Sequence, residues 1–104
     1  MERTGQPYSS GQWLVRAASE EEFIKRWTTW SELTLSNAPG AVSFVLVRSN
    51  EDPRRFLSLT VWENQEAQQA WRATPQAQEL GERCRELCEE VEVHPYTLAA
   101  SLSW

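Results

Sequence analysis

Two neighbouring segments decide the fold: residues 41–48 read AVSFVLVR, and residues 55–63 read RFLSLTVWE. Both are rich in the β-branched and aromatic residues that are typical of strands. The residues between them, SNEDPR at 49–54, are those that tight turns prefer. We therefore expect an antiparallel hairpin.

Each of these strands is apolar on both faces. Successive side chains of a strand point to opposite faces. In the first strand, Val42, Phe44 and Leu46 lie on one face and Ala41, Val45 and Val47 on the other. In the second strand, Leu57, Leu59 and Val61 lie on one face and Phe56 and Trp62 on the other. A sheet with one face in water normally alternates apolar and polar residues. We therefore expect helices on one face and a second copy of the chain on the other, which predicts a homodimer joined through the sheet.

The residues before the hairpin predict a strand and a helix. Residues 12–17, QWLVRA, alternate as a first strand, after a polar stretch at 1–11 that we expect to be a flexible leader. Ser19 and Glu22 match the capping box that starts many helices. The apolar residues that follow recur at helical spacing, and the Pro-Gly pair at 39–40 stops the helix.

The residues after the hairpin predict a second helix and a last strand. Asn64 is a suitable N-cap, the Thr-Pro pair at 74–75 interrupts the helix, and residues 76–90 continue it. Residues 91–102 predict the last strand. The order β-α-β-β-α-β indicates an α+β, ferredoxin-like fold, in which a four-stranded antiparallel sheet has its helices on one face, in a single domain at 12–104.

Length and charge exclude several classes of function. The chain has 104 residues, the length of one domain, and its 10 basic residues are dispersed among 15 acidic ones for a net charge of −5. Nucleic-acid-binding proteins usually carry a basic face, so we expect no nucleic-acid partner. Since no apolar run approaches the roughly 20 residues of a membrane span, and no signal-peptide core is visible, we expect no membrane contact and a cytoplasmic location.

Residues that bind metals or act as nucleophiles are few. Cys84 and Cys88 lie four residues apart in a predicted helix, and we interpret them as small buried apolar residues rather than as a disulfide or a metal pair. The chain has one histidine, His94, so we expect no metal site. Motifs of nucleotide-binding proteins, zinc proteases and serine hydrolases do not occur in the sequence.

Six tryptophans in so short a chain indicate either a heavy core or an aromatic-lined cavity. Ser58, Thr60 and Trp62 alternate onto one face of the strand at 55–63. Two hydroxyls on a buried face favour a cavity, and the alternative is that both bind neighbouring backbone groups. Of Trp27 and Trp30, one is expected in the core and the other as a wall of that cavity.

The segment 60–67, TVWENQEA, resembles the strand-end motif T-x-W-E-[ST]-x-E-A of the antibiotic biosynthesis monooxygenase (ABM) family. The Pro-Gly pair at 39–40 and Trp71 also recur in members, and the resemblance runs from about Gln12 to Leu102. It implies a dimeric α/β barrel, in which two ferredoxin-like protomers pair through their sheets and each holds a cavity between sheet and helices. The activities of the family include cofactor-free oxygenation of aromatic polyketides and quinols, and haem degradation.

The resemblance carries over to some functional positions only. In the polyketide oxygenases, an asparagine four residues before the strand-end tryptophan faces the pocket; Trp62 matches, but Ser58 stands at the asparagine position, and Gln68 stands where they have a tyrosine. The haem-degrading members have a tryptophan where Trp71 stands, but their histidine position is Gly81 here, and their first-strand asparagine is missing. A haem iron needs an axial ligand, so the resemblance disfavours haem degradation.

The resemblance and the aromatic content together predict a cofactor-independent monooxygenase that acts on a small aromatic or quinol-like molecule. The expected substrate-binding residues are Trp62, Trp71, Ser58, Thr60 and Trp27, with no cofactor and no metal. His94 is the candidate base, because its ordinary pKa near 6.5 suits proton transfer at neutral pH; the alternative is an exposed or structural residue. Two other functions stay open: a dimer that binds or senses a small hydrophobic molecule without turnover, and a structural dimer with a filled core.

Overall fold

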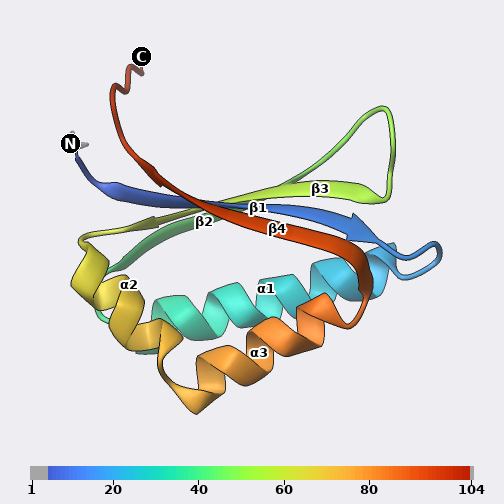
Figure 1. Cartoon of the computed structure of the whole chain (residues 1–104), viewed down its shortest axis with the longest axis horizontal. Helices are drawn as coiled ribbons and strands as arrows, with labels where there is room; N and C mark the ends of the chain where they lie inside the picture. The colour runs from blue at the N-terminus through green and yellow to red at the C-terminus, as the bar shows by residue number, and fades with distance from the viewer. Residues whose placement is uncertain (1–4, 104) are drawn as a thin grey trace.

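The computed structural model describes residues 5–103 and confirms the ferredoxin-like fold (Figure 1). Along the chain the elements are β1 (Pro7–Val15), α1 (Glu20–Asn37), β2 (Ala41–Arg48), β3 (Arg55–Trp62), α2 (Gln65–Arg72), α3 (Pro75–Arg85) and β4 (Cys88–Thr97). The strands form one antiparallel sheet in the order β2-β3-β1-β4. All three helices lie on the same face of this sheet (Figure 1). We call the face toward the helices the inner face and the opposite face the outer face.

The first strand begins five residues earlier than the sequence predicts. Residues 7–11 are not a flexible leader, because they pair with both β3 and β4: Tyr8, for example, lies opposite Val61 on one side and Tyr96 on the other. The glycine and serine residues of this stretch led to the wrong prediction, and Gly11 has a structural reason. A side chain there would place its Cβ 2.6 Å from Trp13 Nε1. Residues 1–4 of the predicted leader lie outside the described residues.

The helix caps agree with the prediction in part. The Asn64 side chain accepts a hydrogen bond from the backbone N–H of Ala67 at 2.8 Å, as expected of an N-cap. Thr74 caps α3 in the same way, with Pro75 in its first turn. The capping box at the start of α1 is wrong, because the Ser19 side chain makes no cap hydrogen bond. Three glutamates in the first turn of α1 still favour that end of the helix dipole.

The last helix is shorter, and the last strand begins earlier, than predicted. α3 ends at Arg85 and β4 runs from Cys88 to Thr97, so residues 88–90 are strand and not helix. Pairing with the end of β1, where Val15 lies opposite Cys88, overrides the helical preference of these residues. Both thiols are free and buried, as expected, and burial raises the pKa of Cys84 to about 12 and that of Cys88 to about 11.

The core between sheet and helices has two parts. The larger cluster comprises Trp13, Val15, Phe23, Trp27, Phe56, Cys84 and Cys88. In its centre the ring of Phe23 lies 5.3 Å from that of Trp13 and 5.1 Å from that of Phe56. The smaller cluster comprises Ala38, Trp62, Trp71 and Ala77, under the α2 end of the sheet. The division leaves room between the clusters for the cavity described below.

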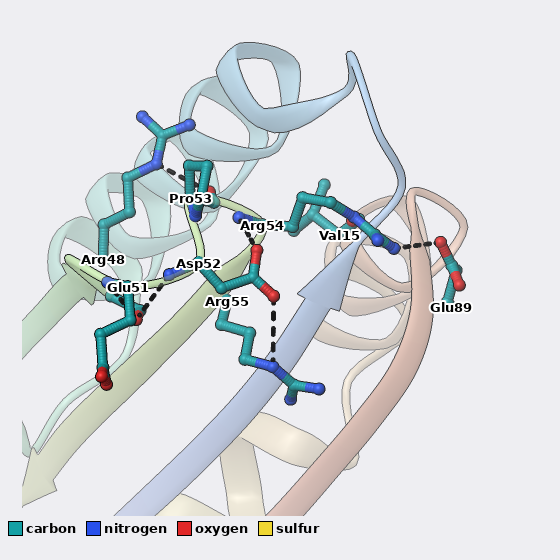
Figure 2. Close-up of polar contacts among 9 residues, drawn as sticks. Val15, Arg48, Glu51, Asp52, Pro53, Arg54, Arg55 and Glu89 are labelled. Atoms are coloured by element: carbon teal, nitrogen blue, oxygen red, sulfur yellow. Dashed lines mark hydrogen bonds and ion pairs between the residues drawn. The ribbon is translucent and has the colours of Figure 1, made fainter.

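The turn between β2 and β3 is tied to two other strands by one arginine (Figure 2). The side chain of Arg54 donates to the carbonyl oxygen of Val15 at 2.9 Å and forms an ion pair with Glu89, at the end of β1 and the start of β4. Within the turn, the Asp52 carboxylate accepts from the backbone N–H of Arg54 at 3.0 Å, and Arg48 donates to Pro53. These contacts close one end of the sheet.

The outer face of the sheet is apolar and uncovered in a single chain. Its side chains include Val45, Val47, Leu57 and Leu59, which pair across β2 and β3 and are each about 40–50% exposed. The sequence pattern predicts this second apolar face, and the three helices leave it bare.

Candidate functional site

A cavity of about 500 Å³ lies between the inner face of the sheet and the helices. Five of the six tryptophans line it: Trp13, Trp27, Trp30, Trp62 and Trp71. The sixth, Trp104, lies outside the described residues. The tryptophans therefore serve both of the roles considered from the sequence, since Trp13 and Trp27 belong to one core cluster, Trp62 and Trp71 to the other, and all four form the cavity walls.

The aromatic walls are held by edge-to-face contacts. The ring of Trp13 lies 6.3 Å from that of Trp30 at an interplanar angle of 90°. The ring of Phe44, another lining residue, lies 5.9 Å from that of Trp62 at 68°. Such T-shaped pairs are a favoured arrangement of aromatic rings and fix their planes. The cavity thus presents rigid, flat, apolar surfaces.

The sheet contributes small polar residues to the same cavity. Ser9, Gly11, Ser58 and Thr60 line it from β1 and β3. Ser58 accepts a hydrogen bond from Trp13 Nε1 at 3.1 Å, and both residues are 4% exposed. The hydroxyl of Ser58 therefore binds an indole N–H rather than a backbone group. It holds the Trp13 ring across Gly11, which has no side chain to block it.

One indole in the wall has a donor without an acceptor. Trp71 is 9% exposed, and its Nε1 is buried with no hydrogen-bond partner among the described residues. A buried donor left unpaired costs roughly 1–3 kcal/mol. The position of this ring is therefore maintained by packing and not by a polar contact.

All three helices line the helical side of the cavity: α1 with Trp27, Trp30 and Ser31, and α2 and α3 with the residues that follow. Ala77, Gly81 and Arg85 lie four residues apart on α3, which places them on one helix face, and all three line the cavity. At Gly81 the space that a side chain would fill is bounded by the Trp30 ring, 3.6 Å from the position of a Cβ. Arg72, the last residue of α2, also lines the cavity.

His94 lies outside the cavity. Its neighbour in the strand, Val93, lines the cavity, and alternation turns the His94 side chain to the outer face. Its partner across β1, Ser10, is buried and lines the cavity. Its imidazole is half exposed and lies 3.5 Å from the Glu92 carboxylate. His94 is not among the described residues that line the cavity, and its role as a base stays a prediction.

The other five predicted site residues come together: Trp27, Ser58, Thr60, Trp62 and Trp71 all line the cavity. Sequence reasoning did not find Trp13 or Arg85 as lining residues. The signals were present, since Gly11 and Trp13 alternate on one strand face, and Arg85 follows Ala77 and Gly81 at helical spacing. Trp13 lies in the predicted strand at 12–17 and Arg85 in the predicted helix at 76–90, so what the prediction lacked was the face of each element that borders the cavity.

The chemistry that the cavity offers is narrow. Among its described lining residues there is no aspartate, glutamate or histidine, and the charged ones are two arginines, Arg72 and Arg85. Within residues 5–103, no three histidine, cysteine, aspartate or glutamate side chains gather where they could hold a metal ion.

None of the described helices is long and apolar enough to span a membrane.

Comparison with known proteins identifies a family and several solved structures to which this chain is similar. The sequence pattern of the antibiotic biosynthesis monooxygenase family matches residues 10–91. No curated protein matches the chain. Among solved structures, a variant of SnoaB, a cofactor-independent oxygenase from Streptomyces nogalater, is similar with a TM-score of 0.86 at 19% identity, over 94% of this chain and 97% of that one.

Two further structures show the same fold. A proposed antibiotic biosynthesis monooxygenase from Bordetella bronchiseptica has a TM-score of 0.79 at 23% identity, over 92% of this chain and 99% of that one. A conserved protein from Methanosarcina mazei has a TM-score of 0.80 at 17% identity, over 89% and 92%. At identities below 25%, these structures show only that the fold is shared. The family is shown by the match of its sequence pattern. With that pattern over most of its length, the chain belongs to the antibiotic biosynthesis monooxygenase family.

Proposed function

We propose that this protein is a cofactor-independent monooxygenase whose substrate is a small aromatic, quinol-like molecule. The observation that carries the proposal is the cavity between sheet and helices, with five indole walls and no carboxylate among its described lining residues. Membership of the family and the similarity to SnoaB, described as a cofactor-independent oxygenase, support it.

The size and lining of the cavity suit such a substrate. Pockets for small molecules usually measure about 300–1,000 Å³ and are mostly apolar with a few placed polar groups. A volume of about 500 Å³ with flat indole walls accommodates two or three fused aromatic rings. Thr60, whose hydroxyl lies on the same strand face as Ser58, offers a donor that can orient a ring oxygen.

In the proposed reaction, the substrate supplies the electrons. A phenolic O–H group, or a CH₂ group that a phenol activates, loses a proton, and the resulting anion gives one electron to O₂. The substrate radical and superoxide then combine into a peroxide anion, which takes up a proton from solvent. The hydroperoxide loses water as its O–O bond and the C–H bond on the same carbon break, which leaves a carbonyl. One oxygen atom of O₂ enters the product and the other leaves as water. The protein holds the ring between indoles and keeps water out, while the substrate proton leaves through the open side of the cavity to solvent.

Oxygen consumption with a panel of dihydroxynaphthalenes and anthrone-type phenols tests the proposal. We expect uptake of one O₂ per substrate for the wild type and a loss of most of it in Trp62→Ala, because this ring forms a wall of the cavity. Gly81→Leu is a second variant, which fills the cavity from α3 without removing a core side chain. His94→Ala, on the outer face, is the matched control and should keep full activity. Uptake by the wild type at the rate of both cavity variants would refute the proposal.

A second candidate function is binding of the same kind of molecule without turnover. Ser58 favours binding without turnover for two reasons. Its hydroxyl already accepts a hydrogen bond from Trp13. The residue also occupies the position at which the oxygenases that the sequence resembles have an asparagine. Native mass spectrometry of the purified protein separates the two functions. A tightly held, unmodified aromatic ligand together with no O₂ uptake supports the binding protein.

The proposed assembly is a homodimer in which the outer faces of two sheets cover one another. The exposed Val45, Val47, Leu57 and Leu59 form a patch that a second copy of the same patch would bury. Sedimentation at micromolar concentration should give twice the chain mass of 12.0 kDa. Leu59→Arg should shift the protein to monomer, whereas Glu66→Arg on α2, away from the sheet, should leave the dimer intact. A monomeric wild type would refute the assembly.

A further inference from the structure

The charges that line the cavity are all positive, although the protein as a whole is acidic. The chain has 15 acidic and 10 basic residues. Of the described residues that line the cavity, Arg72 and Arg85 carry the charge, and no carboxylate lies among them. An acidic protein that places only cations around an apolar cavity attracts anions to that one place.

Neither of these two arginines is neutralised by the protein. Arg26, Arg48, Arg54 and Arg55 each form an ion pair with a carboxylate. Among the ion pairs and hydrogen bonds of residues 5–103, the guanidinium groups of the two cavity arginines have no partner. Their donors are therefore free for a ligand, and a guanidinium binds carboxylates with paired, charge-assisted hydrogen bonds.

The two arginines stand at opposite ends of α3. Arg72 ends α2, three residues before Pro75 begins α3, and Arg85 ends α3. At 1.5 Å per residue, a helix of 11 residues is about 16 Å long. The arrangement is therefore two separate cationic positions on the helical side of the cavity, rather than one clamp around a single group.

We propose that the ligand of this cavity is an aromatic acid, whose rings lie between the indoles and whose carboxylate is bound by Arg72 or Arg85. The proposal deepens the proposed function and takes the same cavity as the substrate site. It concerns binding, so it is tested without turnover. An aromatic ligand with one acidic group satisfies one arginine, and a second oxygen substituent at the far end of the rings reaches the other.

Calorimetric titration under argon with 2-naphthoate and its neutral isostere 2-naphthamide tests this inference. We expect naphthoate to bind about tenfold more tightly or better, the size expected when a hydrogen bond to a charged group is gained. Arg72→Gln or Arg85→Gln should remove most of that advantage and leave naphthamide binding unchanged. Arg72 and Arg85 are exposed, so both variants should fold, and circular dichroism checks this.

Arg83→Gln is the matched control, because Arg83 lies on α3, is exposed, and does not line the cavity. It changes the net charge by the same amount and removes the same kind of residue from the last turn of the helix. An equal loss in Arg83→Gln would mean that the whole field of the protein acts, and would overturn the inference. Equal binding of the acid and the amide, or no binding of either, would overturn it as well.

The outcome is separable from that of the proposed function. Selective binding of naphthoate through one arginine, with no O₂ uptake on any hydroxylated aromatic acid, leaves the inference standing and removes the monooxygenase. O₂ uptake on neutral quinols that is unchanged in both arginine variants supports the monooxygenase and removes the inference about the aromatic acid.

Discussion

The hydrogen bond from Trp13 to Ser58 offers a quantitative test of how the cavity wall is held. The two residues are 45 positions apart in the chain, 3.1 Å apart between Nε1 and Oγ, and both are 4% exposed. Ser58→Ala removes the acceptor and leaves a buried indole N–H unpaired, which costs roughly 1–3 kcal/mol. Since domains of this size unfold with a free energy of about 5–15 kcal/mol, the loss is a large part of the total.

The double variant gives the sharper measurement. Trp13→Phe removes the donor together with part of the ring that contacts Phe23 and Trp30. In Trp13→Phe with Ser58→Ala, no donor is left unpaired, so the double variant should lose about 1 kcal/mol less than the two single losses together. Urea unfolding followed by far-ultraviolet circular dichroism gives all four free energies. Losses that add to within about 0.5 kcal/mol would refute the idea that this bond is energetically coupled.

Three further predictions concern glycines and thiols. Gly11→Ala should lower the unfolding free energy by about 1–3 kcal/mol in urea titrations, because its Cβ would lie 2.5 Å from Ser58 Oγ. Gly81→Ala should raise the unfolding free energy by about 0.5–1 kcal/mol in the same assay, because its Cβ meets Trp30 at an ordinary 3.6 Å and glycine weakens a helix; a loss would contradict it. Burial raises the pKa of Cys84 from 9.0 to about 12 and that of Cys88 to about 11. A raised folded-state pKa stabilises the fold fully below about pH 9, and this stabilisation is lost as the pH rises toward the folded value. Unfolding midpoints between pH 8 and pH 11 should therefore fall, and both thiols should react with Ellman's reagent at pH 8 only in urea.

The sequence predicts the hairpin and its inner face because local signals agree there. Residues 41–48 and 55–63 are strand-forming throughout, and period-two alternation correctly placed Ser58, Thr60 and Trp62 on one face. The start of β1 was not predictable in the same way, because its glycine and serines are tolerated only where two neighbouring strands and the Trp13 ring cover them. The helix predicted for residues 88–90 was wrong for a related reason, since pairing with β1 outweighs their local helical preference.

His94 shows that the face a strand residue occupies depends on long-range pairing. Moving by one residue along a strand exchanges the two faces of a sheet. The register of β4 is set by its long-range pairing with β1, which includes an irregularity between Leu14 and Val15. No local pattern in residues 88–97 carries that information, so Val93 rather than His94 reaches the cavity. Cationic lining is likewise a property of the assembled helices, because Arg72 and Arg85 belong to different helices.

The central position of β1 also governs the order in which the molecule can fold. Of the described elements, β1 is made first and β4 last, and the two neighbours of β1 in the sheet are β3 and β4. Pro7 pairs with Thr97, so the contact spans almost the entire chain, and loops of this length close slowly. Until β4 emerges, a nascent chain has one edge of β1 open and the cavity without Val93. Completion of the sheet, and with it of the cavity wall, therefore has to wait for β4, the last of the described elements to be made.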